Sequence, residues 1–85
     1  MTKQRAEYAV DLTGAARRDL IRINTRRVIE RLDEAIQSFA ADPRPPGAKK
    51  LTAQQEYRYR VGDYRILYEI DDAARSILVT RIRHR

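Results

Sequence analysis

Hydrophobic and polar positions alternate with a period of two in two neighbouring stretches, and this pattern predicts a β-hairpin. Tyr57–Val61 alternates aromatic or apolar residues with Arg58 and Arg60, and Tyr64–Ile70 is an apolar run broken by one arginine and one glutamate. Between them lies Gly62-Asp63, and glycine readily takes the positive φ that a two-residue hairpin turn requires. Because successive side chains point to opposite faces of a strand, the hairpin has one core face and one cationic face.

The chain before this hairpin predicts one strand followed by two helices. Glu7–Leu12 alternates polar and apolar residues, which is typical of a half-buried strand. Apolar residues at helical spacing predict helices over Ala15–Ile23 and Arg26–Ala40, joined by a tight turn. Thr13 is a suitable N-cap for the first helix. Asp42-Pro43 ends the second, because the residue before a proline avoids the α region.

The chain after the hairpin predicts a turn at Asp71–Ala74 and a last strand over Ser76–Arg83, in which Leu78, Thr80 and Ile82 share the core face. The resulting order, β-α-α-β-β-β, indicates an α+β fold. In this fold a helical hairpin packs on one face of a curved, mainly antiparallel four-stranded sheet. The sheet residues expected in the core are Tyr8, Val10, Leu12, Tyr57, Tyr59, Val61, Ile66, Tyr68, Leu78 and Ile82.

Length and composition point to one small intracellular domain. Eighty-five residues form a single domain, 1–85, with residues 1–6 expected to be frayed. Cysteine is absent from the sequence, so neither disulfides nor thiolate chemistry contributes. The sequence contains no apolar run long enough to cross a bilayer, and we expect a cytoplasmic protein that does not bind membranes.

The net charge of +6 is unevenly distributed. Residues 1–42 contain eight basic and seven acidic residues, whereas residues 43–85 contain ten basic and five acidic ones. Strand parity collects arginines on the sheet face away from the helices, with few carboxylates among them. These arginines repel one another, so the face should bind something anionic. They are Arg58, Arg60, Arg65, Arg81, Arg83 and Arg85.

Four segments stand out together: Asp42-Pro43, Lys49-Lys50-Leu51, the run from Tyr57 to Tyr68 and the closing Arg83-His84-Arg85. They resemble the RelE/ParE superfamily, the toxins of type II toxin–antitoxin pairs. The resemblance implies a RelE-like fold and a toxin that halts growth. It also implies neutralisation by a cognate antitoxin, which we expect to be acidic, partly disordered and folded on binding.

The superfamily has two branches with different targets. RelE-like members are endoribonucleases that cut mRNA on the ribosome and block translation, and ParE-like members inhibit DNA gyrase. The resemblance favours a metal-independent endoribonuclease without a cofactor, with gyrase inhibition and non-enzymatic nucleic-acid binding as the alternatives. On the RelE-like reading, the implied catalytic residues are Arg65, Arg85, Arg60 and Arg58. The candidate RNA-binding residues are Lys49, Lys50, Arg81 and Arg83, although the two lysines at the end of the proline-rich loop are equally consistent with simple solvation.

Proton carriers are harder to assign than cations. RelE-like enzymes often carry lysine where Arg58 and Arg60 stand, and arginine cannot act as a general base because it does not lose its proton. The catalytic tyrosine that such enzymes usually carry beyond the last strand is absent from this sequence, which ends at Arg85. The alternation of side chains along the last strand places His84 on the sheet face that does not carry the arginines. Asp71-Asp72 is expected to serve the turn rather than a metal. Tyr57, Tyr59 and Tyr68 are expected to pack in the core.

Overall fold

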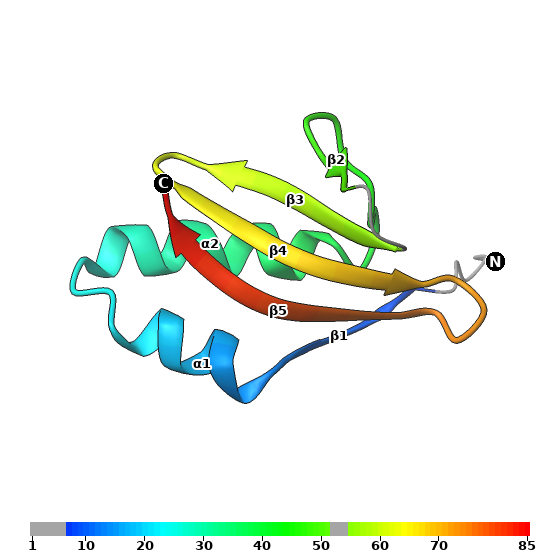
Figure 1. Cartoon of the computed structure of the whole chain (residues 1–85), viewed down its shortest axis with the longest axis horizontal. Coiled ribbons are helices and arrows are strands. Elements are labelled where there is room, and N and C mark those ends of the chain that lie inside the picture. The colour runs from blue at the N-terminus through cyan, green and yellow to red at the C-terminus, as the bar shows by residue number, and fades with distance from the viewer. Residues whose placement is uncertain (1–6, 52–54) are drawn as a thin grey trace, which may run out of the picture.

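The computed structural model describes residues 7–51 and 55–85, so the expectation for residues 1–6 lies outside the described residues. The chain forms five strands and two helices in the described part (Figure 1). In chain order they are β1 (Ala9–Leu12), α1 (Gly14–Ile21), α2 (Arg26–Ser38), β2 (Lys49–Lys50), β3 (Glu56–Val61), β4 (Tyr64–Asp71) and β5 (Ser76–His84). No helix among these residues is long and apolar enough to cross a membrane.

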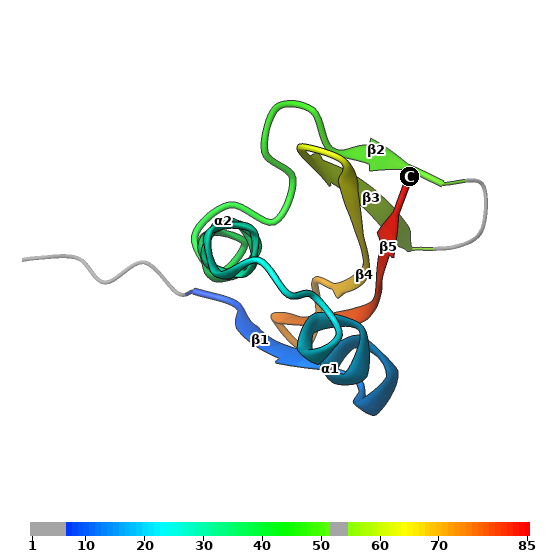
Figure 2. The same cartoon turned by 90° about the vertical axis from the view of Figure 1, so that its left-hand side faces the viewer.

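The strands form one mixed sheet in the order β1-β5-β4-β3-β2. β1 pairs with β5 in parallel, and every other pairing is antiparallel. Both helices lie on the same side of this sheet, and the other side, here called the open face, carries none of the described elements (Figure 2). The expected α+β fold is therefore confirmed. The sheet has five strands rather than four because the two-residue β2, which follows a proline-rich connector, pairs with β3.

The hairpin and the first helix cap form as the sequence predicts. Val61 pairs with Tyr64, and Gly62 between them has φ +60°, which glycine takes without strain. The Thr13 hydroxyl oxygen accepts a hydrogen bond from the Ala16 backbone N–H at 3.1 Å, and this contact caps α1. Both helices end two residues earlier than expected, within the usual uncertainty of helix ends.

The core lies between α2 and the central strands. The ring of Phe39, just after α2, stacks on that of Tyr68 in β4 with 4.2 Å between centroids, and both residues are fully buried. Burying each large side chain contributes roughly 1.5–3 kcal/mol relative to its exposed state. The buried residues are Ala16, Leu32, Ile36, Phe39, Tyr57, Ile66, Tyr68, Ile70, Ile77, Val79 and Ile82.

The expected alternation of β5 is wrong in the first half of that strand. Leu78 was expected in the core but is 37% exposed, whereas its neighbours Ile77 and Val79 are buried. Ile82, four residues further on, is buried as expected. The strand therefore changes parity between Val79 and Ile82.

A β-bulge at Thr80 causes this change of parity. Tyr68 pairs with Val79 and Leu67 pairs with Arg81, so Thr80 is the extra residue on β5. Its hydroxyl donates to the Leu67 carbonyl at 3.2 Å, and its own carbonyl accepts from the hydroxyl of Thr13 at 2.8 Å. Neither glycine nor proline marks this position in the sequence, so simple alternation could not reveal the bulge.

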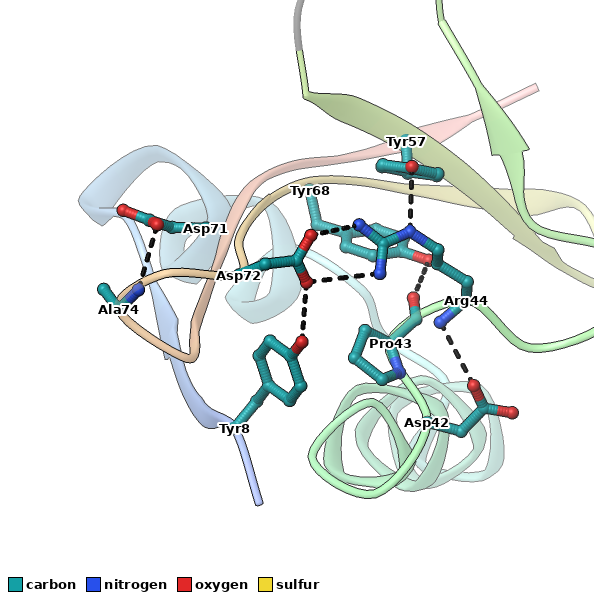
Figure 3. A network of polar contacts seen from close by, with 9 residues as sticks. All are labelled: Tyr8, Asp42, Pro43, Arg44, Tyr57, Tyr68, Asp71, Asp72 and Ala74. Carbon is teal, nitrogen blue, oxygen red and sulfur yellow. Dashed lines mark hydrogen bonds and ion pairs between the residues drawn. The ribbon is translucent and has the colours of Figure 1, made fainter. Parts of the chain in front are cut away.

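A polar network around Arg44 fixes the connector between α2 and β2 (Figure 3). The Arg44 guanidinium donates to both oxygens of Asp72, at 3.3 and 2.8 Å, and its Nε donates to the Tyr57 hydroxyl at 2.9 Å. The Tyr8 hydroxyl also donates to Asp72, at 2.6 Å. The neighbouring Asp71 accepts from the Ala74 backbone N–H and so shapes the turn. Asp71 thus has the expected turn role. Asp72 also takes part in the turn, because its backbone carbonyl accepts from the Arg75 N–H at 3.3 Å, while its side chain binds the connector.

Candidate anion-binding site on the open face

Register places three arginines in one row across the open face. Arg65 in the central strand β4 lies directly opposite Arg60 on β3 and Arg83 on β5. Directly opposed residues in an antiparallel pair point to the same face, with Cβ atoms about 5 Å apart. In the next row, Lys49 of β2 lies opposite Arg58 of β3. Short β2, missing from the predicted sheet, therefore adds a lysine to the cationic face.

Four of these cations line one hollow of about 140 Å³, formed by Gly47, Lys49, Arg58, Arg60 and Arg65. Gly47 has φ +99°, a backbone conformation that side chains other than glycine strain to adopt, and it returns the chain toward β3. Arg60 Nε donates to the Gly62 carbonyl at 3.1 Å, which restrains that side chain. Within the described residues, none of the four cations forms an ion pair. The hollow is therefore a cationic cradle with charge available to an anion.

Arg81 is held by the protein rather than left available. Its Nε and Nη2 atoms donate to the Asp19 carboxylate at 2.8 and 3.1 Å, and the Ile82 backbone N–H donates to the same carboxylate at 2.9 Å. These bonds, led by those from Arg81, hold the pKa of Asp19 below its usual value. β1 pairs with β5 only as far as Val79. Asp19 thus joins α1 to the next part of β5, at Arg81 and Ile82.

The remaining predicted cations are dispersed. Lys50 lies opposite the buried Tyr57 and so points away from the open face. Arg85 follows β5 at the hairpin turn, where its Nε lies 3.8 Å from a carboxylate oxygen of Asp63 and its backbone N–H donates to the Asp63 carbonyl. Arg83 lies in the arginine row. The structure thus brings Lys49, Arg58, Arg60 and Arg65 together, and Arg83 lies beside them in the arginine row.

The aromatic residues considered as proton carriers lie on the helix side of the sheet. Tyr57 and Tyr68 are buried as expected, whereas Tyr59 is half-buried beside the core. Burial raises the pKa of the Tyr68 hydroxyl, which donates to the Pro43 carbonyl at 2.7 Å. His84 pairs with Tyr64 on the helix side of the sheet, and their rings meet edge to face at 4.9 Å between centroids. His84 therefore lies on the helix side of the sheet and the arginines lie on the open face, as the alternation of the strand predicted.

Carboxylates occupy the other end of the same open face, a feature that the sequence analysis missed. Glu56 lies directly opposite Glu69, and Glu69 is in turn opposite the exposed Leu78. The sequence did contain a signal for this acidic end. Glu69 is an even number of residues from Arg65 on the same strand, and Glu56 from Arg58, so both glutamates should share the face of the arginines. This acidic end surrounds a hollow of about 470 Å³, lined by Gln55, Glu56, Glu69, Ile70, Asp71, Ser76 and Leu78.

Fold and surface together define a small α+β protein with an exposed, cationic sheet face suited to anions. Residues 10–85 match the family described as the ParE toxin of the type II toxin–antitoxin system, parDE. The chain belongs to this family of toxins, within the RelE/ParE superfamily.

Individual relatives agree with this assignment. The chain is 32% identical over 80 residues to Toxin RelG of Mycobacterium tuberculosis (strain ATCC 25618 / H37Rv), covering 92% of this chain and 91% of that one. It matches a chain of the RelBE2 toxin–antitoxin complex of Mycobacterium tuberculosis with a TM-score of 0.80 and 30% identity, covering 93% and 99% of the two chains. The archaeal RelE–RelB complex of Pyrococcus horikoshii OT3 gives a TM-score of 0.83 at 23% identity, with 92% and 94% coverage, which shows a shared fold.

Proposed function

We propose that this toxin is a metal-independent endoribonuclease that cuts mRNA on the ribosome and is neutralised by a cognate antitoxin. The observation that supports this proposal is the cationic cradle, in which Lys49, Arg58, Arg60 and Arg65 surround a hollow large enough for a phosphate group. Arginine suits phosphate because its planar fork donates two parallel hydrogen bonds and stays charged at every relevant pH.

The cradle supplies electrostatic stabilisation for cleavage by the RNA's own 2′-hydroxyl. The 2′-oxygen bonds to the adjacent phosphorus while the bond from phosphorus to the 5′-oxygen breaks, which leaves a 2′,3′-cyclic phosphate and a 5′-hydroxyl. The arginines stabilise the extra negative charge on the phosphorane. Lys49 is the one cradle side chain that can donate a proton to the leaving 5′-oxygen, and the 2′-hydroxyl proton passes to solvent.

A ribosome supplies what a small sheet surface lacks. The cradle is shallow and binds backbone charge, so it cannot by itself hold an RNA strand in the in-line geometry that this attack needs. An mRNA already fixed in the decoding site presents that geometry to the cradle. Because the ribosome is itself rich in phosphate, the basic face also favours association with it.

The antitoxin is the second proposed partner. Solved relatives include RelBE2 from Mycobacterium tuberculosis and the intact RelBE complex of Escherichia coli, both described as toxin–antitoxin complexes. For the present chain we propose an acidic, partly disordered antitoxin that folds on contact and covers the cationic cradle. Such a partner would compete directly with RNA.

Primer extension on cellular mRNA after induction tests the nuclease. We expect new 5′ ends within translated regions, and we expect them to disappear when initiation is blocked. Full-length mRNA in growth-arrested cells, with the toxin soluble and abundant, would refute the proposed activity.

Inhibition of DNA gyrase is the second candidate function, because the matching family is the ParE toxin family. The position of His84, on the sheet face opposite the cradle, also favours a binding role over acid–base chemistry. Trapped gyrase–DNA cleavage complexes with intact mRNA would select this function.

A further inference from the structure

Like charges stand directly opposite one another at both ends of the open face. Arg65 is flanked by Arg60 and Arg83 in one row, and Glu56 faces Glu69 in another. Opposed like charges destabilise a sheet, whereas opposed unlike charges stabilise it. Neither end neutralises the other, so each end gains stability from a partner of opposite charge.

A single strand connects the two ends. The open-face residues of β4 are Arg65, Leu67, Glu69 and Asp71, in that order, because the residues between them, Ile66, Tyr68 and Ile70, are buried. At about 3.3 Å per residue, Arg65 and Asp71 lie roughly 20 Å apart along the strand. An extended peptide of about seven residues would span this distance, so one short segment can cover both charge blocks.

The acidic end has the shape and the apolar contact that a basic side chain needs. Its hollow of about 470 Å³ has the exposed Leu78 on one side and the Glu56–Glu69 pair on another. Lysine and arginine bind such surfaces well, since the aliphatic stem packs on apolar atoms while the charged group reaches a carboxylate. Leu78 reaches this face only because the bulge at Thr80 shifts the strand.

We propose that the neutralising segment of the antitoxin lies along β4 on the open face, with charges ordered to match. Its acidic residues cover the cradle around Arg65, and its lysine or arginine residues enter the hollow beside Glu56, Glu69 and Leu78. RNA cannot occupy the acidic end, because Glu56, Glu69 and Asp71 repel phosphate. RNA and antitoxin therefore share the basic end, and the acidic end is used by the antitoxin alone. This inference rests on the proposed antitoxin partnership but not on the proposed nuclease activity.

The test uses the full-length toxin and its cognate antitoxin. We expect Glu56→Gln/Glu69→Gln to weaken antitoxin binding about tenfold at physiological salt, and to weaken neutralisation of growth arrest. Growth arrest by the free toxin should be unchanged. Thermal stability should not fall, because the substitutions remove an opposed pair of like charges. Glu30→Gln/Asp33→Asn, on the exposed face of α2, removes the same charge elsewhere and should bind the antitoxin like the parent.

Three results would overturn the proposal: equal affinity of the Glu56→Gln/Glu69→Gln variant, equal weakening in the α2 control, or a toxin dimer that the Glu→Gln changes dissociate. The last would assign the acidic end to a second copy of this chain. Hydrogen exchange measured on the complex gives an independent test. The backbone amides of β4 and β5 near Glu69 and Leu78 should exchange more slowly in the complex than in the free toxin. A failure of the nuclease proposal would appear separately, as a free toxin that cleaves no mRNA while its antitoxin affinity still depends on Glu56 and Glu69.

Discussion

Asp19 binds Arg81 through two hydrogen bonds, of 2.8 and 3.1 Å, and its side chain is only 10% exposed. The same carboxylate accepts a hydrogen bond from the Ile82 backbone N–H, so it occupies the edge of β5 just beyond its pairing with β1. One acidic residue of α1 therefore fixes both the helix on the sheet and Arg81, which the sequence analysis had named as a candidate RNA-binding residue.

Replacing Asp19 should destabilise the fold. Asp19→Ala leaves the Ile82 N–H and the Arg81 guanidinium without their partner, and a lost partner of this kind costs about 1–3 kcal/mol. Urea unfolding monitored by circular dichroism measures the change. Asp33→Ala, on the exposed side of α2, serves as the control and should alter the free energy of unfolding by less than about 0.5 kcal/mol. Equal stability of Asp19→Ala and the parent would show that the contact contributes nothing.

The contribution of Asp19 should depend on pH. Because hydrogen bonds from Arg81 lower its pKa in the folded state below the ordinary 3.8, the ionised form is favoured by folding. The stabilisation is fully present above the unfolded value and is lost as the pH falls through the folded one. The difference in unfolding free energy between the parent and Asp19→Asn should therefore be larger at about pH 6 than at about pH 2. A difference that stays constant would contradict the linkage.

Cleavage should depend on Arg65, which projects from the central strand into the cradle. On the proposed nuclease mechanism, Arg65→Ala removes a contact to the charge that develops on the phosphorane, and such a loss costs roughly 3–4 kcal/mol, or two to three decades in rate. Arg65→Lys should recover only part of the activity because it keeps the charge and loses the fork. Cleavage of a ribosome-bound message, with folding checked by circular dichroism, measures both variants. Arg31→Ala, on the exposed face of α2, should cleave like the parent.

Arg85 tests how far the site extends. It lies beside the hairpin turn with Asp63, outside the residues that line the cradle. The family resemblance still implies a catalytic role, so Arg85→Ala should abolish toxicity while the fold and antitoxin binding persist. Growth arrest after induction measures this effect. Normal toxicity of a soluble Arg85→Ala protein would restrict the site to the cradle.

Salt should reveal how many phosphates the cradle neutralises. For single-stranded RNA, the slope of log affinity against log salt falls by about 0.7 for each phosphate contact. Arg58→Gln should therefore weaken binding and make the slope shallower by about that amount. Arg27→Gln on α2 should leave the slope unchanged. Titration of a labelled oligonucleotide at several salt concentrations gives the slopes, and identical slopes for parent and Arg58→Gln would exclude a phosphate contact by Arg58.

The parity change in β5 predicts an unusual order of stabilities. Ile77→Ala removes a buried side chain and should cost about 2–5 kcal/mol. Leu78→Ala, one residue further on, removes a side chain that is 37% exposed and should cost far less. Chemical denaturation of the two variants compares neighbouring aliphatic residues directly. The reverse order would mean that β5 continues without the bulge at Thr80.

Sequence patterns identified the elements whose signals are local. The period-two run around Gly62-Asp63 located the hairpin, and Thr13 identified the start of α1. Patterns failed where a distant partner decides the conformation. The bulge at Thr80 depends on contacts with Leu67 and Thr13, which lie 13 and 67 residues away. The two-residue β2 exists only through its pairing with β3.

Site prediction divided along the same line. Parity placed Arg58, Arg60 and Arg65 correctly on one face, because it needs only the residues of one hairpin. The partner of Arg81 could not be predicted, since Asp19 lies 62 residues away on a helix. The acidic end was overlooked although the same reasoning reaches it, because the two-residue turn that pairs Val61 with Tyr64 also sets Glu56 opposite Glu69.

The parallel pairing of β1 with β5 has a consequence for how the toxin is made. Residues 9–12 pair with residues 76–79, so β1 is synthesised long before the strand that it pairs with. Until residues 76–84 have been made, β1 has no partner strand and Asp19 of α1 has no contact with Arg81 and Ile82. β1 and α1 therefore take their places on the sheet only after β5 has formed, and contacts of such long sequence separation slow folding.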